Sequence, residues 1–517
     1  MSSRTSETET STDQGQDGAL RADRLGTAGL LFSVLAASAP LTVMAAVMPT
    51  AFATVGLVGQ PLIFLVLGVV SALFTVGYAE LSRRAHHAGA FYAHIARGLG
   101  PTAGAGASHV ALASYSALQA GLGGLIGFEV CELIDHRFDV TIDWWVPALL
   151  AVALAGGLAR LRVDLSAKVL GVLLLVEVAL VVVFDAAALV QPAADRLSPH
   201  ALNPHTLARG GVGTALCLCA AAFTGFAQAP VYAEETRRPG VVVRRVLFLA
   251  VGSVTALLVL GSWALTLAAG PRDIVDSAQK QGPGLLFALA GNTLGATFAD
   301  VLHVLYVTGV LAALLAFHNV AARYAFAMGR EGLLPAGFGR TRPAGGAPMA
   351  GSLLGTAISV VLVAAFALTD SRPPGDPTAP VTHLCAWTGA FGGLGVVVLM
   401  AASCLSAIVH FVRRGEAAAQ RWRLLAAGLA GLALLGIAAY GVKRLPVLLG
   451  ADPHGALSRL LPGLLVLVLV GGLVHGLVLR VRRPEVHAGI GRGNEARRTT
   501  PGSGTGQERA TEHLTER

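Results

Sequence analysis

The sequence predicts an all-α integral membrane protein with twelve transmembrane helices. Only 13% of its 517 residues are charged, 54% are hydrophobic, and long apolar runs recur along the chain. Soluble domains carry about 25% charged residues, and about 20 apolar residues span a bilayer. The runs that predict the spans are residues 27–54, 62–82, 101–128, 144–159 (the shortest), 166–190, 211–233, 246–269, 296–328, 348–368, 381–412, 424–442 and 457–479.

The distribution of Lys and Arg predicts the orientation of the spans. The loops after the second, fourth, sixth, eighth and tenth spans carry about twice as many Lys and Arg residues as the opposite loops. Loops rich in positive charge face the cytoplasm. We therefore expect a multi-pass protein of the cytoplasmic (inner) membrane with both termini cytoplasmic. The net charge of +8 is interpreted as a topology signal, and no nucleic-acid partner is expected.

The two terminal segments and the cysteines give no sign of a further domain. Residues 1–25 and 484–517 are predicted to be disordered cytoplasmic tails, because their composition offers too little apolar surface to fold. The five cysteines show neither metal-ligand spacing nor a disulfide framework. Glycine-rich stretches inside apolar spans lack the Lys-Ser/Thr of a phosphate-binding loop. We therefore predict no metal site, no catalytic residues and no enzyme activity.

The first and sixth spans each contain a break in the helical pattern. At Ala37-Ser38-Ala39-Pro40, Pro40 lacks an N–H and its ring clashes with the preceding turn. At Phe223-Thr224-Gly225-Phe226, Gly225 permits a turn at low steric cost. A proline kink or a glycine packing contact would explain either break alone. Paired breaks in corresponding positions of two halves indicate the substrate site of a secondary transporter built from inverted repeats.

Three loop motifs on the predicted cytoplasmic side carry a family resemblance. After the second span comes GYAELSRR (77–84) and then AGAFYAHIARGLGP (88–101); after the eighth comes HNVAARYAFAMGREGLLP (318–335), closing at Gly346-Ala347-Pro348; and the sixth runs out through EETRRP (234–239). Together they resemble the amino acid permeases of the amino acid, polyamine and organocation family. The resemblance covers roughly residues 26–445.

This resemblance implies a leucine-transporter-type core of two five-helix inverted repeats followed by two further helices. The repeats would comprise residues 26–195 (spans one to five) and 210–415 (spans six to ten), and residues 416–483 would hold spans eleven and twelve. The first and sixth spans would be the discontinuous helices that bind substrate near the middle of the membrane.

A broken helix suits an α-amino acid, because it offers free amides at one half-helix end and free carbonyls at the other. We expect the substrate carboxylate to bind N–H groups around Ser38 and Ala39, and its ammonium to bind carbonyls of residues 223–225. Two polar residues of the third span, Tyr115 and Gln119, could line the same cavity. The predicted substrate-binding residues are Ala37, Ser38, Ala39, Pro40, Thr42, Tyr115, Gln119, Phe223, Thr224, Gly225 and Phe226.

One departure from the family pattern bears on substrate charge. Many members carry a glutamate directly after the Gly-Phe pair of the sixth span, whereas this chain has Ala227 followed by Gln228. Selectivity for arginine, lysine or polyamines is therefore less expected. Phe223 and Phe226 flank Gly225 and are either gates over bound substrate or ordinary core aromatics.

Ionisable residues inside spans are costly and are functional by default. Glu177, near the middle of the fifth span, is either a protonatable group that couples substrate to a proton gradient or a carboxyl fixed between helices. Lys168 resembles a lysine that replaces a sodium site in a proton-coupled branch of the family, or it is an interfacial lysine whose ammonium reaches the headgroups. Glu80, Arg83 and Glu235 are candidates for a cytoplasmic gate, with solvated interfacial charges as the alternative.

The sequence therefore predicts a secondary active transporter of an amino acid or a related small zwitterion or amine, working by alternating access and driven by protons. The alternative is an amino acid exchanger without a proton-coupled step. No cofactor is expected beyond a proton gradient or a counter-substrate. The expected partners are the small-molecule substrate and the lipid bilayer. The sequence leaves the oligomeric state open. An intramembrane enzyme would need a cluster of catalytic His, Asp or Glu residues at one membrane depth, and the sequence shows none. A sensor with the same pocket would bind ligand without moving it across the membrane.

Overall fold

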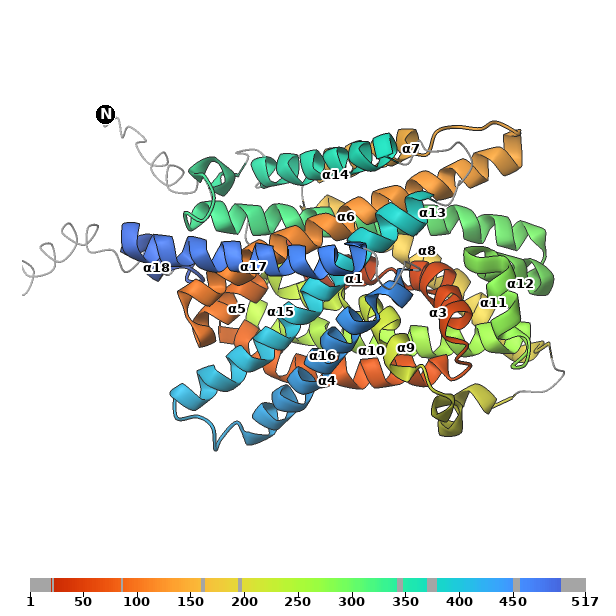
Figure 1. The fold of residues 1–517 in the computed structure, drawn as a ribbon, viewed down its shortest axis with the longest axis horizontal. Coiled ribbons are helices and arrows are strands. Elements are labelled where there is room, and N and C mark those ends of the chain that lie inside the picture. Colours follow the sequence, from red (N-terminus) through yellow and green to blue (C-terminus); the bar gives the residue numbers. More distant parts are fainter. Residues whose placement is uncertain are drawn as a thin grey trace, which may run out of the picture.

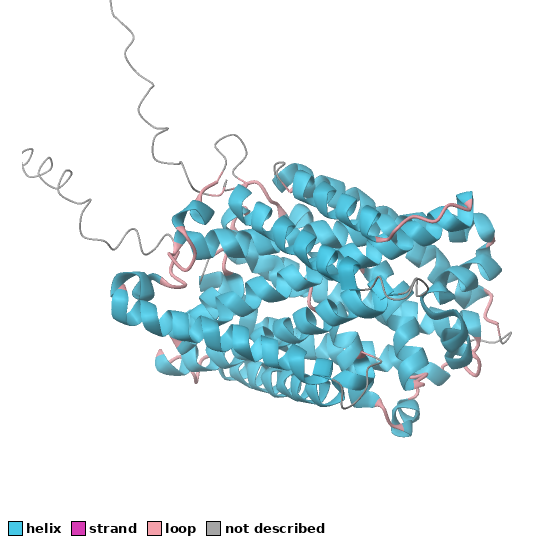
Figure 2. Cartoon of the chain, turned by 45° about the horizontal axis from the view of Figure 1, so that its top comes forward, coloured by secondary structure: helices cyan, strands magenta, loops and turns pink. Residues whose placement is uncertain are grey.

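The computed structural model describes residues 20, 23–84, 87–159, 163–193, 198–341, 347–369, 379–449 and 456–493. These residues form helices and connecting loops, with no strand among them (Figures 1 and 2). Eleven helical segments of the described chain are long and apolar enough to cross a membrane: Thr27–Val55, Gln60–Arg84, Pro101–Asp135, Gly171–Val190, Val212–Glu235, Pro239–Ala269, Ala296–Arg330, Met349–Thr369, Pro380–Arg413, Arg421–Leu448 and Ser458–Arg482.

The fourth predicted span is absent from these eleven because it is shorter than the others. The helix α7 (Trp145–Leu158) is apolar but has 14 residues, so it falls short of the roughly 20 that cross a bilayer at right angles. It packs between α6 (Pro101–Phe138) and α14 (Met349–Thr369). With α7 counted as the fourth span, Thr27–Val55 is the first span and Val212–Glu235 is the sixth.

Both predicted breaks are present. The first span consists of α1 (Thr27–Ser38), α2 (Pro40–Thr42), the π-helix η1 (Val43–Val47) and α3 (Met48–Val55). Ala39 interrupts it in the left-handed conformation, with φ +40°, which costs a residue other than glycine roughly 1–2 kcal/mol. The sixth span consists of α9 (Val212–Ala220), the short 3₁₀ turn η4 (Ala221–Phe223) and the 3₁₀ helix η5 (Phe226–Glu235), with Thr224 and Gly225 between the last two.

The remaining long helices surround these two spans, and most of them run along the long axis of the molecule (Figure 1). They are α4 (Gln60–Arg84), α6, α8 (Val163–Val190), α10 (Pro239–Ala269), α13 (Ala296–Arg330), α14, α15 (Ala386–Arg413), which continues the π-helix η8 (Pro380–Cys385), α16 (Arg421–Leu448) and α17 (Ala456–Arg482).

Short helices mark the two ends of the bundle. At one end lie α5 (Ala90–Leu99) and α18 (Pro484–Gly489), and at the other lie α11 (Ile274–Gln281) and α12 (Leu285–Leu294) (Figure 1). We call the first the inner end, because the loop charges predict it to be cytoplasmic, and the second the outer end. The loops hold the 3₁₀ turns η2 (His200–Leu202), η3 (Pro204–Arg209), η6 (Gly282–Gly284) and η7 (Ala336–Gly339).

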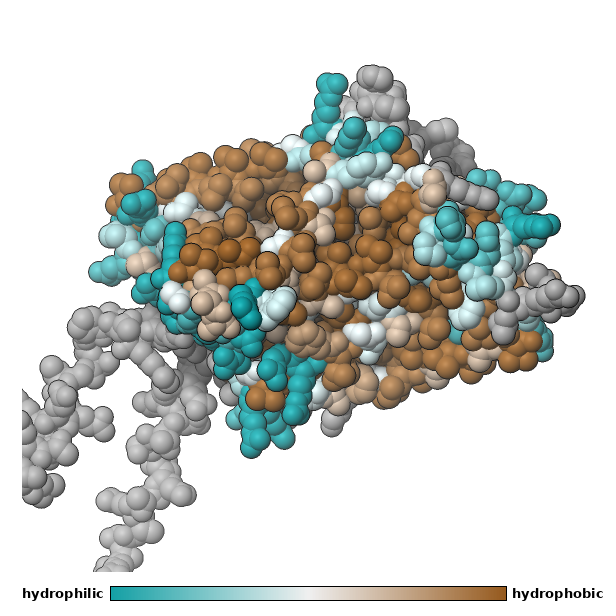
Figure 3. All heavy atoms as spheres, turned by 90° about the horizontal axis from the view of Figure 1, so that it is seen from below, coloured by the Kyte–Doolittle hydropathy of each residue, from teal (hydrophilic) through white to brown (hydrophobic). Residues whose placement is uncertain are grey.

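The outer surface of the bundle is apolar. Leu432, Leu467 and Val361 have 65–71% of their surface exposed, and a broad apolar band crosses the face shown in Figure 3, with polar side chains mostly around its margins. Soluble monomers rarely expose contiguous apolar patches of such extent. In a bilayer the same side chains contact lipid, so this surface fits a membrane-embedded bundle.

Both predicted tails contain structured residues next to the membrane spans, which differs from the sequence-based expectation. Within residues 484–517, Pro484–Gly489 forms α18 and Ile490 is buried with 2% exposed. Within residues 1–25, Leu25 is buried and pairs with Thr236 in an isolated bridge. Composition cannot reveal these partners, because they come from distant parts of the chain. Residues 1–19 and 494–517 lie outside the described residues.

Candidate substrate site and inner gate

The two breaks lie directly against each other. A side-chain carbon added at Gly225 would be 2.6 Å from the Ser38 nitrogen and 2.7 Å from the Ala37 carbonyl carbon and oxygen. The backbone of the sixth span therefore touches the backbone of the first at the points where both helices are interrupted. Thr224 and Phe223 are also buried, with 2% and 3% exposed. The predicted juxtaposition of the two breaks is present in the structure.

The first break offers fewer free amides than the sequence suggests. The Ala39 amide donates to the carbonyls of Leu35 and Ala36, at 3.1 and 3.2 Å, and so belongs to α1. Pro40 has no N–H, so the outer half of the span, Pro40–Val55, presents its first amide at Leu41. The expectation of a free N–H at Ala39 is therefore wrong for this conformation.

The Leu41 amide is already hydrogen-bonded to Glu177. Its Oε1 accepts a hydrogen bond from the Leu41 N–H at 3.0 Å, and the side chain is 3% exposed. Its Oε2 lies beside α13, because a carbon added at Gly309 would be 2.6 Å away. The carboxyl from α8 thus sits where the first, fifth and eighth spans meet. A helix start favours negative charge, since its backbone amides point outward.

Lys168, the other candidate for proton coupling, lies within α8, but its side chain is outside the part of the chain that the structure describes. Its predicted role stays a prediction.

Two buried oxygen atoms beside the breaks have no hydrogen-bond partner among the described residues. They are Thr42 Oγ1, on the outer half of the first span, and Gln228 Oε1, on η5. The Gln228 amide nitrogen donates to the Ser33 carbonyl at 3.3 Å, which ties η5 to α1. Buried polar atoms are nearly always paired with protein or water, so these oxygens are positioned for a ligand or a water molecule. The sequence singles out Gln228 only as a departure from the family pattern.

The third-span candidates face other helices. Gln119 donates to the Gly355 carbonyl at 3.1 Å and to Ser359 Oγ at 2.7 Å, both on α14. It therefore ties α6 to α14 instead of taking its predicted place beside the breaks. Tyr115 stacks on Tyr324 of α13, with ring centres 5.5 Å apart, and its buried hydroxyl has no hydrogen-bond partner among the described residues.

The two phenylalanines next to Gly225 are buried in this conformation. Phe226 is fully buried and packs edge-on against Phe74 of α4, with ring centres 5.9 Å apart. Phe223 has 3% of its surface exposed. Phe226 therefore has the contacts of a core aromatic, and neither phenylalanine is exposed as an open gate residue would be.

Ion pairs join the inner half of the sixth span to α13. Arg323 donates to both carboxylate oxygens of Glu235 at 2.7 and 3.0 Å, and both side chains are buried. Arg330 holds Glu234 in the same two-bonded way, at 2.6 and 2.7 Å. The amides of Arg24 and Leu25 donate to the Glu235 carbonyl at 2.9 and 3.0 Å. These contacts tie the start of the first span, η5 and α13 together at the inner end.

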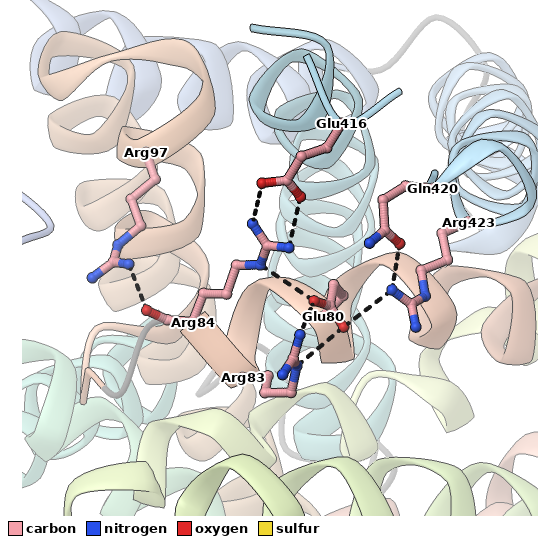
Figure 4. Close-up of polar contacts among 7 residues, drawn as sticks. All are labelled: Glu80, Arg83, Arg84, Arg97, Glu416, Gln420 and Arg423. Atoms are coloured by element: carbon pink, nitrogen blue, oxygen red, sulfur yellow. Dashed lines mark hydrogen bonds and ion pairs between the residues drawn. The ribbon is translucent and has the colours of Figure 1, made fainter. Parts of the chain in front are cut away.

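Glu80 and Arg83, the other gate candidates, belong to a separate cluster. Glu80 pairs with Arg83 at 2.6 Å and with Arg84 at 3.2 Å, and Arg84 also pairs with Glu416 (Figure 4). This cluster joins α4 to the connection between α15 and α16. The structure therefore separates Glu80 and Arg83 from the Glu235–Arg323 pair.

A cavity of about 280 Å³ lies next to the outer halves of the two broken spans. Ala46 and Thr50 line it from the first span, and Cys217 and Ala221 line it from the sixth, with α15 and α16 opposite. Its volume approaches the lower end of small-molecule sites, about 300 Å³. Free space thus lies beside the outer halves of the two spans, while ion pairs link η5 to α13 on the inner side.

One partly buried contact between a histidine and a carboxyl was not predicted. His303 Nε2 lies 3.0 Å from Glu129 Oε2, joining α13 to α6 near the outer end, and Phe287 of α12 stacks on the His303 ring at 4.5 Å. Glu129 and His303 are 174 residues apart in sequence, so no local spacing indicates the pair. The one available signal is Glu129 itself, a carboxyl just beyond the third predicted apolar run.

A family model of amino acid permeases matches residues 25–442. The chain belongs to the amino acid permease family. It is therefore a membrane transporter of the amino acid permease type, and its predicted fold class is confirmed.

Two further comparisons place this permease among known proteins. It is similar to the branched-chain amino acid permease BcaP of Bacillus subtilis (strain 168), with 28% identity over 203 residues; the match covers 38% of this chain and 41% of BcaP, so it spans less than half of that relative. Its fold is similar to the manganese transporter of Eremococcus coleocola in complex with an aromatic bis-isothiourea substituted compound. That likeness has 13% identity, covers 90% of this chain and 98% of the transporter, and has a TM-score of 0.56.

A mutant of the same manganese transporter gives a TM-score of 0.56 over 89% of this chain and 97% of that chain, at 13% identity. At this identity the likeness shows the fold alone. Among the described residues of the permease, no group of three or more His, Cys, Asp or Glu side chains is placed to hold a metal ion.

Proposed function

We propose that this permease moves a neutral amino acid across the cytoplasmic membrane by alternating access, and that Glu177 couples this movement to protons. The observation that carries the proposal is the hydrogen bond from the Leu41 amide to Glu177, at the break of the first span. An amide at a helix start is the group that would bind the carboxylate of an amino acid. In this conformation the Leu41 amide is already bonded to the Glu177 side chain.

The coupling follows from competition between two carboxylates. An ionised Glu177 repels a second negative charge placed beside it and occupies the Leu41 N–H. Protonation of Glu177 removes the repulsion and weakens its hold on the amide, because a neutral carboxyl is a poorer acceptor than a carboxylate. The substrate carboxylate then binds the outer half of the first span, and one proton accompanies each amino acid.

The surrounding residues favour a neutral substrate. Ala227 and Gln228 provide no carboxylate for a cationic side chain. The substrate ammonium would bind the unpartnered Gln228 Oε1 and the carbonyls of residues 223–225. The similarity to a branched-chain amino acid permease suggests leucine, isoleucine or valine, and the apolar cavity beside Ala46 and Ala221 suits an aliphatic side chain.

Transport by the purified protein in liposomes tests this proposal. An inward proton gradient should raise leucine uptake by the native protein. Glu177→Gln should lose this stimulation but still exchange labelled leucine for internal leucine, because exchange needs no net proton movement. Glu132→Gln, which alters an exposed carboxyl at the outer end of α6, should behave as the native protein does. Gradient-stimulated uptake by Glu177→Gln would show that the coupling group lies elsewhere.

Exchange without proton movement is the second candidate. The same hydrogen bond from the Leu41 amide favours it. In that case Glu177 keeps one protonation state throughout the cycle and serves only to fix the shape of the break. A native protein that exchanges leucine rapidly and ignores the proton gradient would establish this alternative.

A further inference from the structure

A pocket of about 520 Å³ opens at the inner ends of α4, α10 and α16, away from the two breaks. Arg244 and Arg245 of α10 and Arg423 of α16 line it, together with Glu80 of α4. Val76 of α4 and Phe248 and Leu249 of α10 line it as well. We call the three arginines the cationic part of the lining and the three apolar side chains its apolar part.

The carboxylates near the pocket are already neutralised. Glu80 is 4% exposed and contacts Arg83 at 2.6 Å, Arg84 at 3.2 Å and Arg423 at 3.4 Å (Figure 4). Glu416 is held by Arg84 through two hydrogen bonds, at 2.7 and 2.9 Å. Three guanidinium groups thus surround one buried carboxylate, which leaves the polar wall with excess positive charge.

Arg244 and Arg245 add to this excess. Both side chains are exposed, and neither forms an ion pair with another described residue. A guanidinium group presents a planar set of donors that matches phosphate oxygens in pairs. Two such groups from adjacent positions of α10, with Arg423 of α16 in the lining of the same pocket, offer donors for a phosphate group.

The apolar part continues this pocket along the lipid-facing surface. Phe248 and Leu249 lie one turn further along α10, with 43% and 49% of their surface exposed. A soluble anion would gain nothing from these two side chains. A molecule with a phosphate headgroup and a hydrocarbon chain would contact both parts at once.

We propose that this pocket binds an anionic phospholipid of the inner leaflet. Its phosphate contacts Arg244, Arg245 and Arg423, and an acyl chain lies along Phe248 and Leu249. Basic pockets between spans on the cytoplasmic side hold anionic headgroups for this electrostatic reason. The bound lipid joins α10 to α16 and thereby stabilises the inner end of the bundle.

Native mass spectrometry of the full chain in detergent tests this site, with phosphatidylglycerol as the probe and phosphatidylcholine as the neutral comparison. The native protein should retain phosphatidylglycerol. Arg244→Gln with Arg245→Gln should bind it roughly tenfold more weakly or worse, since two charge-assisted contacts are lost. The matched control is Arg480→Gln with Arg482→Gln, which removes the same charge from exposed residues at the inner end of α17 and should bind as the native protein does.

Two further experiments distinguish a bound lipid from a free anion, and loss of the site from misfolding of the variant. Phe248→Ser should weaken phosphatidylglycerol binding, and excess inorganic phosphate should not displace the lipid. Arg244→Lys with Arg245→Lys keeps the charge and should bind between the native protein and the Gln variant. Equal lipid binding by the Gln variant and its control would overturn the site. Full displacement by phosphate, together with unchanged binding by Phe248→Ser, would overturn the lipid as its occupant.

Discussion

Glu177 and Leu41, 136 residues apart in sequence, share a hydrogen bond of 3.0 Å at the centre of the bundle. The bond joins a side chain of α8 to the first backbone amide of the outer half of the first span. Because the same carboxyl touches α13 at Gly309, a change in its charge reaches three spans at once.

Gly309→Ala should disturb this contact without altering any charged group. The added carbon would lie 2.6 Å from Glu177 Oε2 and 3.1 Å from its carboxyl carbon, so the carboxyl must move. We expect gradient-driven leucine uptake to fall at least about tenfold, since displacing a catalytic or coupling group by about 1 Å has effects of this size or larger. Uptake and exchange in liposomes would be measured side by side. Unchanged stimulation by protons would contradict the coupling role of this contact.

Gly225→Ala should damage the site more directly. Its new carbon would meet backbone atoms of Ala37 and Ser38, which cannot rotate away as a side chain can. We expect a loss of stability of about 1–3 kcal/mol and loss of substrate-induced stabilisation in thermal unfolding. Gly252→Ala is the control, because its added carbon has no neighbour within 4 Å. A Gly225→Ala protein that is stabilised by leucine as the native protein is would show that the breaks do not form the site.

Loss of either partner of the buried pair Glu235–Arg323 should destabilise the protein more than loss of both. Glu235→Leu or Arg323→Leu leaves one buried charge unpaired, which costs about 3–5 kcal/mol. The double variant removes both charges, so it should recover much of the lost thermal stability. Arg83→Gln should change stability by less than about 1 kcal/mol, because Arg83 is half exposed. Additive losses in the double variant would mean that the two side chains do not act as a pair.

Docking of the carboxyl-terminal segment should depend on pH through Glu331, which follows α13. Burial raises the pKa of Glu331, but His87 and the amides of Gly491 and Gly493 outweigh it and hold the pKa below its ordinary value. Such a carboxyl stabilises the docked segment fully above its unfolded pKa of about 4.3, and that stabilisation is lost as the pH falls through the lower folded value.

We therefore expect hydrogen exchange at Gly491 and Gly493, corrected for the intrinsic pH dependence, to show protection at neutral pH that declines below about pH 4. Glu331→Gln should reduce this protection at neutral pH. Protection that is the same in Glu331→Gln and the native chain would show that other contacts hold the segment.

Local rules explain why the spans and the two breaks could be predicted from the sequence. Pro40 and Gly225 act on the backbone within one turn, and the apolar runs report contact with lipid directly. The 3₁₀ character of η5 was not predicted; Pro230 inside it removes one donor of the α-helical pattern and is a visible sign.

The partners of the polar side chains could not be predicted, because they depend on helix rotation and on distant residues. Gln119 has the polarity expected of a cavity residue, yet it turns toward Ser359. The polar composition of residues 484–493 suggests disorder, yet the segment is held by Glu331, more than a hundred positions earlier. Glu235 was predicted as a gate candidate, and the structure supplies its partner, Arg323.

Arg330, the last residue of α13, and Glu331, which follows it, contact segments from opposite halves of the chain. Arg330 binds Glu234 on the inner side of the two breaks, and Glu331 accepts hydrogen bonds from the amides of Gly491 and Gly493. A carbon added at Gly493 would lie 3.3 Å from Arg330 itself. Displacement of residues 491–493 would therefore uncover the arginine that ties Glu234 to α13, so the proposed alternation between closed and open states would be coupled to the segment that follows α17.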